Sequence, residues 1–482
     1  MKEKIIDLRL LVIPLVALTV GLGFFVQQSD FVPIISQFGI FFFCYLLIFK
    51  YANEKSNLTF FIGVSILLRF ILLFALPNLS DDVYRFIWDG RLLLNGHNPF
   101  DFLPSYYIEN NISIPGINEA LFQKLNSPEY FTIYPPVAQG VFALACWLFP
   151  NSIIGSAITL KVFLFLCEIG SLFFIKKLLD HFQIPAKNIL LYALNPLIII
   201  ELCGNLHFEA AMICFLLASI YFLVTNSASK LGDNLQVLPN FSTKKSDLKI
   251  NTNLGGNWKL PPKHLILSAI SMALSIASKL LPLMFLPFLI KRLGWKKSIQ
   301  YFSIVGIIIV LLFAPLLSGA FLNNFGTSLD LYFQKFEFNA SIYYAIRWVG
   351  YQVVGYNWIQ SAGPALAVLV LLGILTATFL EKNFTWKNVS GKMLFAICIY
   401  LAFATIVHPW YVSLPIVLCL FTQFRFPILW SGLIFLTYSN YSYGVYFENL
   451  WMVGIEYVLV FSFLIYELTK TYSIFPLKNQ SK

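Results

Sequence analysis

Long apolar runs, each of about 16 to 22 residues, recur along almost the whole chain. A helix needs about 20 apolar residues to cross the hydrocarbon of a bilayer, because it rises roughly 1.5 Å per residue. The hydrophobic fraction of 58% also exceeds what a soluble domain needs for its core. Transmembrane β-strands would instead alternate in polarity over segments of about ten residues. The sequence therefore predicts an all-α, polytopic membrane protein with about 13–14 transmembrane helices.

The whole chain, 1–482, is expected to form a single membrane domain. The N-terminal apolar run is interpreted as an uncleaved first helix, because it is long and many spans follow it. The loops that we expect between spans are a large outer loop at 78–156 with interfacial helices, a cytoplasmic linker at 227–263 and a second outer loop at 319–361. The predicted spans are 10–27, 32–49, 58–77, 157–177, 188–203, 209–226, 264–279, 280–292, 298–318, 362–380, 392–408, 409–423, 427–441 and 451–470.

Basic residues indicate the orientation. With both termini in the cytoplasm, 25 of the 33 lysines and arginines fall in cytoplasmic segments and six fall outside, which is the bias expected of a membrane protein. The apolar stretch 133–149 would invert every later loop if it crossed the bilayer. We therefore expect it to form a helix in the outer interface, begun by Tyr134-Pro135-Pro136, since prolines suit a first helical turn.

Other features exclude some classes of function. The basic residues are spread over many short loops without interleaved stacking aromatics, so nucleic-acid binding is not predicted. The seven cysteines lie in or beside apolar runs and no CxxC occurs, so neither a disulfide framework nor a zinc site is indicated. Arg69 lies inside an apolar span, and we expect it to pair with a loop carboxylate.

The first large loop opens with a cluster of charges between Ser80 and Arg91. Three carboxylates and two guanidinium groups occur there within twelve residues, although only 12% of the chain is charged. Such a cluster at a membrane boundary is costly unless it contacts water, a substrate or a partner charge. The predicted topology places further polar groups on the same outer side, namely His97, Asn98, Tyr134, His207, Glu209, Lys279, His408 and Tyr411.

Each of these groups also has a structural interpretation. Carboxylates can cap helices or pair with nearby arginines, a lysine at a helix end can extend to the interface, and aromatic residues can anchor a helix there. These alternatives stay open for Asp81, Asp82 and Asp89 (capping, or pairing with Arg85 and Arg91), for His207 and Glu209 (capping), for Lys279 (extension to the interface) and for His408 with Trp410 (anchoring).

The run from Ser80 to Arg91, followed by Asn95-Gly96-His97-Asn98-Pro99-Phe100, resembles the first-loop signature of polytopic GT-C glycosyltransferases. The similarity is greatest to bacterial polyprenol-phosphate-mannose-dependent mannosyltransferases, and it covers most of residues 58–425. Further matching segments are Thr132-Ile133-Tyr134-Pro135-Pro136, Leu194-Asn195-Pro196-Leu197, His207-Phe208-Glu209, Ser278-Lys279-Leu280-Leu281-Pro282 and His408-Pro409-Trp410-Tyr411.

The resemblance implies that the first outer loop supplies the catalytic carboxylate. By its spacing from Arg85, Asp82 resembles the catalytic aspartate, with Asp81 as the second candidate. Lys279 is the first candidate for binding the donor phosphate, followed by Arg85 and Arg91. Glu209 departs from the pattern, because family members often carry Asp there. The candidates for contacts to the sugar or the acceptor are Asp89, His97, Asn98, Tyr134, His207, Glu209, His408 and Tyr411.

The activity implied is an inverting transfer of a sugar, with mannose as the leading expectation. The implied donor is a polyprenyl-phosphate sugar, and the acceptor is a glycan or glycolipid on the periplasmic or outer face of the cell (inner) membrane. No cofactor is required, because the phosphate ester already activates the donor; a divalent metal is left open. Two alternatives remain: a lipid-linked sugar transporter or flippase, which would usually carry midplane polar residues and inverted repeats, and a non-catalytic membrane subunit.

Overall fold

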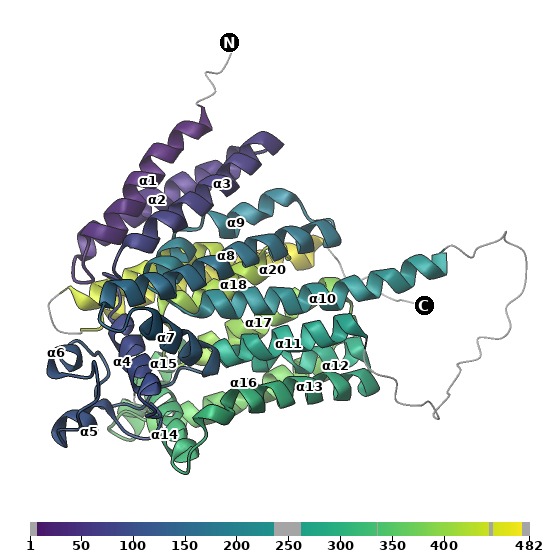
Figure 1. Ribbon diagram of the computed structural model, residues 1–482. Helices are drawn as coiled ribbons and strands as arrows, with labels where there is room; N and C mark the ends of the chain where they lie inside the picture. The colour runs from purple at the N-terminus through teal and green to yellow at the C-terminus, as the bar shows by residue number, and fades with distance from the viewer. Residues whose placement is uncertain (1–6, 236–261, 335, 443–446, 475–482) are drawn as a thin grey trace, which may run out of the picture.

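A computed structural model describes residues 7–235, 262–334, 336–442 and 447–474. These residues form a bundle of long helices, with a layer of short helices gathered at one end (Figure 1). Most of the predicted linker, residues 236–261, lies outside the described residues, as do the lysines at positions 2, 4, 335, 478 and 482. The described chain contains a single isolated β-bridge, which joins Phe338 to Ile406.

The long helices come from three parts of the chain. The first three pack together at one side of the bundle (Figure 1). They are α1 (Val12–Val20), α2 (Phe31–Tyr51) and α3 (Lys55–Ile71), with 3₁₀ segments at Leu8–Leu11 and Leu72–Phe74 and a π-helical segment at Gly21–Phe25. The central group contains α8 (Ile153–Phe182), α9 (Leu190–Ala193), α10 (Glu209–Leu235), α11 (Lys263–Ser278), α12 (Pro287–Leu293) and α13 (Trp295–Phe313). The C-terminal group contains α16 (Ile359–Phe379), α17 (Trp386–Phe403), α18 (Ser413–Cys419), α19 (Phe426–Leu433) and α20 (Leu450–Ile474).

The short helices cap the bundle at the end where α8 and α10 begin (Figure 1). They belong to the two predicted outer loops. The first loop holds α4 (Asp82–Leu94), α5 (Pro104–Glu109), α6 (Glu119–Phe122) and α7 (Pro136–Leu148), and the second holds α14 (Phe321–Gln334) and α15 (Ile342–Val353). The structure thus has both loops at the same end of the bundle. The topology predicted from basic residues places both on the same side of the membrane.

The predicted spans all coincide with helical segments, but not all of them are long. Within the described ranges, seven helices are long and apolar enough to cross a membrane, or eight if one bent pair is a single span. The prediction of 13–14 also counted shorter segments, such as α11 and the region 409–423, which forms a 3₁₀ turn followed by the seven-residue α18. The bent pair, Ala186–Ala193 and Ile198–Gly204, turns by 57° at Asn195-Pro196, where proline interrupts backbone hydrogen bonding.

Helix α7 is the segment for which an interfacial helix was predicted. Its 13 residues extend about 20 Å, which is less than the ~30 Å thickness of the hydrocarbon core. Pro136 occupies its first turn, as the sequence led us to expect. The helix packs closely on α4 through Gly90, where a Cβ atom would lie 2.4 Å from the Phe142 carbonyl oxygen and 2.8 Å from Cys146 Sγ. Position 90 therefore needs glycine for α4 and α7 to pack this closely.

Arg69 has a different partner from the one expected. Its guanidinium Nε lies 3.0 Å from Glu168 Oε2, and both side chains are fully buried. Glu168 belongs to α8 rather than to a loop, so the prediction of a loop carboxylate was wrong. The reason is that α8 places its own carboxylate inside the apolar core, where a buried charge needs a nearby counter-ion. This pair joins α3 to α8.

Candidate active site

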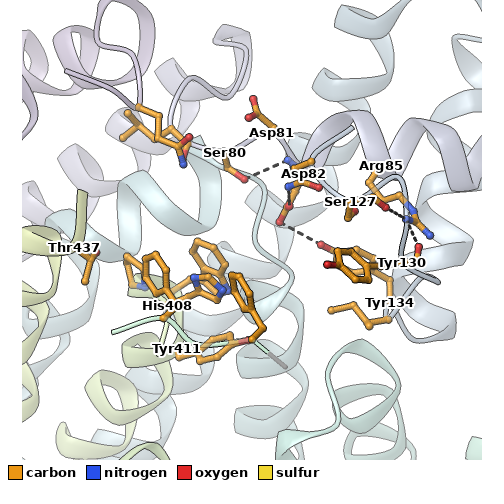
Figure 2. Close-up of a pocket in the computed structure, with 18 of the residues that line it drawn as sticks. Ser80, Asp81, Asp82, Arg85, Ser127, Tyr130, Tyr134, His408, Tyr411 and Thr437 are labelled. Atoms are coloured by element: carbon orange, nitrogen blue, oxygen red, sulfur yellow. Dashed lines mark hydrogen bonds between the residues drawn. The ribbon is translucent and has the colours of Figure 1, made fainter. Parts of the chain in front are cut away.

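Asp82 begins helix α4 and points into a cavity. Its carboxylate accepts two hydrogen bonds from the first loop. Asn126 Nδ2 donates to Oδ1 at 2.8 Å. The Tyr134 hydroxyl donates to Oδ2 at 3.2 Å (Figure 2). A carboxylate at a helix N-terminus also faces the positive end of the helix dipole. The two donors and the dipole fix the orientation of the carboxylate.

The cavity has a volume of about 410 Å³ and lies between the first loop and the ends of several long helices. Figure 2 shows Asp82 and Tyr134 across it from His408 and Tyr411. Seven of the predicted site residues line this cavity: Asp81, Asp82, Arg85, Tyr134, Lys279, His408 and Tyr411. The structure thus brings together residues from loops that are far apart in the sequence.

Tyr134 lies between the carboxylate of Asp82 and the ammonium group of Lys279. Its hydroxyl donates to Asp82, while Lys279 Nζ lies 5.6 Å from the centre of its ring, within cation–π range. Lys279 Nζ also lies 3.3 Å from Oε1 of Glu209, which is 1% exposed. Glu209 was predicted to contact sugar or acceptor, but in this arrangement it lies behind Lys279 as its counter-ion. A negative and a positive group therefore face the cavity on either side of one tyrosine.

Arg85 and Asp89 form a buried pair one helical turn apart. Arg85 Nε lies 2.9 Å from Asp89 Oδ1, and Arg85 Nη1 donates to the carbonyl oxygens of Ser127 and Tyr130. Asp89 is fully buried and also accepts from Gln139 Nε2 at 3.0 Å. Although Arg85 reaches the cavity wall, its hydrogen bonds hold the loop at 127–130 against α4.

Six of the predicted residues do not line the cavity: Asp89, Arg91, His97, Asn98, His207 and Glu209. Arg91 donates to the carbonyl oxygens of Gly116 and Pro150, at 2.6 and 3.0 Å. Asn98 Nδ2 donates at 2.7 Å to the carbonyl oxygen of Leu316, in the 3₁₀ segment Ala314–Leu316 that follows α13. The His97 ring contacts Tyr107 edge-on. Arg91 and Asn98 therefore donate to backbone carbonyl groups and do not face the cavity.

A stack of three rings lies at the opposite wall, which two of them, His408 and Trp410, line. The Trp410 indole has His207 on one side, with centroids 3.6 Å apart, and His408 at 4.4 Å, and both imidazoles lie nearly parallel to it. Both faces of the indole are therefore covered, so it does not present a flat face to a sugar. Tyr411 meets the His408 ring edge-on.

A buried carboxylate behind this wall escaped the sequence analysis. Glu201 is fully buried in the π-helical segment Ile198–Gly204. Its carboxylate accepts from the Tyr438 hydroxyl at 2.8 Å and from Asn205 Nδ2 at 3.1 Å, and it lies 3.3 Å from His207 Nε2. Tyr438 itself lines the cavity. In the sequence, Glu201 is a lone carboxylate within an apolar run. Burial of a carboxylate at such a position is costly, so the residue could have been recognised as a candidate from the sequence. Other lining residues that the sequence did not single out include Gln28, Ser80, Asn126, Tyr130, Phe338 and Tyr441.

The electrostatics differ between the two sides of the cavity. Partial desolvation beside the cavity and the neighbouring charge of Asp82 raise the pKa of Asp81, whose side chain still reaches solvent at the rim. His408 precedes its 3₁₀ turn, in a loop outside the long helices; burial, with His207 and Lys279 nearby, lowers its pKa. The imidazole of His408 is therefore neutral near pH 7, which leaves Lys279 as the cation suited to an anionic ligand there.

No cluster of three or more His, Cys, Asp or Glu side chains suited to a metal ion occurs in the described parts of the chain.

Comparison with known proteins identifies the family. Residues 28–294, more than half of the chain, match the MptA_B family, described as alpha-(1->6)-mannopyranosyltransferase, N-terminal domain. No curated protein and no solved structure matches significantly. The match includes Asp82, Tyr134, Glu209 and Lys279, and it agrees with the resemblance seen in the first loop. The chain therefore belongs to the alpha-(1->6)-mannopyranosyltransferase family of GT-C glycosyltransferases and is a polytopic membrane mannosyltransferase.

Proposed function

We propose that this protein transfers mannose, with inversion at the anomeric carbon, from a polyprenyl-phosphate donor to a hydroxyl group of a glycan or glycolipid. The observation that carries the proposal is the placement of Asp82 and Lys279 on either side of Tyr134. A base and a cation close together suit a displacement in which one oxygen loses a proton while another gains negative charge.

Asp82 is the proposed general base. Its carboxylate is held by Asn126 and Tyr134 and faces the cavity, so an acceptor hydroxyl could bind within hydrogen-bond distance of it. Asp81 is less suited to this role because it lies at the exposed rim, and its side chain makes no capping hydrogen bond to α4.

Lys279 is the proposed ligand of the donor phosphate. Its ammonium group faces the cavity, and Glu209 holds it from behind. A preorganised cation stabilises the charge that develops on the leaving phosphate without any need for reorganisation. Arg85 is a weaker candidate, since Asp89 and two loop carbonyls already bind its guanidinium group.

The proposed reaction is a single displacement at the anomeric carbon. The acceptor oxygen forms a bond to the anomeric carbon of mannose as its proton passes to Asp82. The bond between that carbon and the phosphate oxygen breaks on the opposite face, and its electron pair stays on the lipid phosphate beside Lys279. Attack from the face opposite the leaving group inverts the anomeric configuration.

A lipid-linked donor suits the position of the cavity. The residues that line the cavity include several from the first loop. The short helices of the two loops gather at one end of the bundle of apolar helices (Figure 1). A donor whose chain stays in the bilayer would present its phosphate at that level. The excess of basic residues in the loops at the other end supports an outer or periplasmic location for the cavity.

The test is incubation of the purified protein with a panel of polyprenyl-phosphate sugars and an oligosaccharide acceptor, following both release of the lipid phosphate and label in the acceptor. Mannose transfer that depends on Asp82 is the expected result. Binding of the donor without turnover would favour a non-catalytic subunit. Movement of the lipid-linked sugar across a vesicle membrane without transfer would favour a flippase.

A further inference from the structure

A second cavity lies on the first loop, next to the one that contains Asp82. Its volume is about 350 Å³, and it opens broadly to the surface. The residues that line it belong to the segment around α5 and to the stretch before Thr132, and they include Asp101, Phe102, Tyr106, Glu109, Glu129 and Phe131. The proposed reaction does not use this cavity.

Two exposed aromatic rings form one part of its lining. Phe102 and Tyr106 stack in parallel, with centroids 4.2 Å apart and planes inclined by 11°, and remain 45% and 36% exposed. Both contact the buried Tyr107 edge-on, which holds the pair in place. Rigid aromatic surfaces bind apolar faces at a low entropic cost, and the electron-rich ring attracts the C–H bonds of a sugar face.

Three carboxylates, those of Asp101, Glu109 and Glu129, also line this cavity, and no lysine or arginine lines it. Asp101 accepts from the hydroxyl of Ser318, which lies just after α13, and Glu129 accepts from the Ser105 hydroxyl at 3.0 Å, so two of the three are held in place. Carboxylates accept hydrogen bonds from hydroxyl groups at several positions, and such charge-assisted bonds are the stronger kind. The charge disfavours phosphates and other anions, whereas a neutral polyhydroxyl ligand matches both the carboxylates and the aromatic pair.

The two cavities meet at Phe131. This side chain lines both of them, and the residue before it, Tyr130, lines the cavity of Asp82. The backbone at this point is fixed, because the Ser328 hydroxyl donates to the Phe131 carbonyl oxygen at 3.1 Å. A chain-like ligand whose end lies at Asp82 can therefore continue past Phe131 onto the aromatic pair.

We propose that this second cavity is an extension site for the acceptor, in which sugar units of an oligosaccharide beyond the one that receives mannose bind Phe102, Tyr106 and the three carboxylates. The inference rests on the proposed function, since it assumes that the acceptor reaches Asp82. It adds that the acceptor is an oligosaccharide and that its length determines how well it binds.

The experiment measures initial rates of mannose transfer by the full-length purified enzyme to a simple mannoside and to a series of longer mannose oligosaccharides. The wild-type KM should fall as the acceptor lengthens. In Tyr106→Ala the KM for long acceptors should rise by roughly two- to tenfold, which corresponds to the loss of one aromatic contact, so that the dependence on length shrinks. Tyr106→Phe keeps the ring and should restore that dependence. Glu119→Gln is a matched control, because Glu119 is an exposed carboxylate of the same loop that lines neither cavity.

The outcomes separate the two proposals. If mannose is transferred but the KM is independent of acceptor length, or if Tyr106→Ala and Glu119→Gln behave alike, the extension site is refuted and the proposed function stands. If the wild-type enzyme transfers no mannose, the proposed function fails. Direct binding of a mannose oligosaccharide, measured calorimetrically, then decides: binding that Tyr106→Ala weakens supports the cavity as a glycan site, and no binding overturns it.

Discussion

Replacement of Asp82 by Asn should remove catalysis while leaving the fold intact. The two groups that hold Asp82 can hold an amide as well: Asn126 Nδ2, now 2.8 Å from Oδ1, keeps an oxygen acceptor, and the Tyr134 hydroxyl at 3.2 Å can accept from the new NH₂ group. The free energy of unfolding should thus change by less than about 1 kcal/mol. The base is lost, however, and a positioned general base contributes about 10²- to 10⁴-fold. The activation free energy should rise by roughly 3–5 kcal/mol.

The assay is the initial rate of transfer from labelled polyprenyl-phosphate mannose, with kcat and both KM values determined separately. We expect kcat to fall by at least about a hundredfold, with little change in either KM, because the carboxylate acts chiefly in the transition state. Asp180→Asn, which removes one partner of an exposed pair with Lys176, is the control and should behave like the wild type. Turnover of Asp82→Asn within about tenfold of the wild type would refute the assignment, and loss of activity in Asp81→Asn alone would move the role to Asp81.

Three further predictions concern charges described above. Lys279→Ala should lower kcat/KM for the donor by roughly 10- to 100-fold, since a hydrogen bond to a charged group contributes about 1.5–3 kcal/mol; an unchanged kcat/KM would instead mean that Lys279 only extends to the interface. Arg69→Met should lower stability by about 3–5 kcal/mol, because it leaves Glu168 buried without its cation. Thermal unfolding in detergent would show this, with Lys176→Ala in the exposed pair as a control, and equal effects of the two changes would contradict the argument. Asp81→Asn should raise the melting temperature near pH 7, because the raised pKa of Asp81 means that its ionised form costs stability above that pKa. The gain should shrink as the pH falls towards the ordinary value of 3.8, and a gain that grew on acidification would show the opposite shift.

Much of the fold could be predicted from the sequence, because bilayer-length apolar runs leave few alternatives to helices. The number of full-length spans was harder to predict. Hydropathy does not distinguish one long helix from two short ones joined at a bend, as at Ala186–Gly204, or from a 3₁₀ turn that leads into α18. The partner of Arg69 was missed because a pairing between α3 and α8 depends on how the helices pack, which spacing in the sequence does not encode.

For the candidate site, the sequence predicted only which residues lie on the same side of the membrane. The topology brought Asp82, Lys279 and His408 to one side of the membrane, and all three line one cavity. Which charges face the cavity could not be deduced. Arg85 and Asp89 are four residues apart on a helix, a spacing that favours mutual pairing, and that pairing is what the structure shows. The loop carbonyls that bind Arg91 have no recognisable signature in the sequence.

The stack of His207, Trp410 and His408 bears on where the enzyme could be divided. The family match ends at residue 294, so His207 belongs to the matched part while Trp410 and His408 do not. A truncated chain that ended near residue 294 would leave one face of the His207 ring bare and would open the cavity of Asp82 on that side. The matched region therefore supplies the proposed base and the proposed phosphate ligand but only part of the cavity wall. The two halves of this chain should be expressed and engineered together.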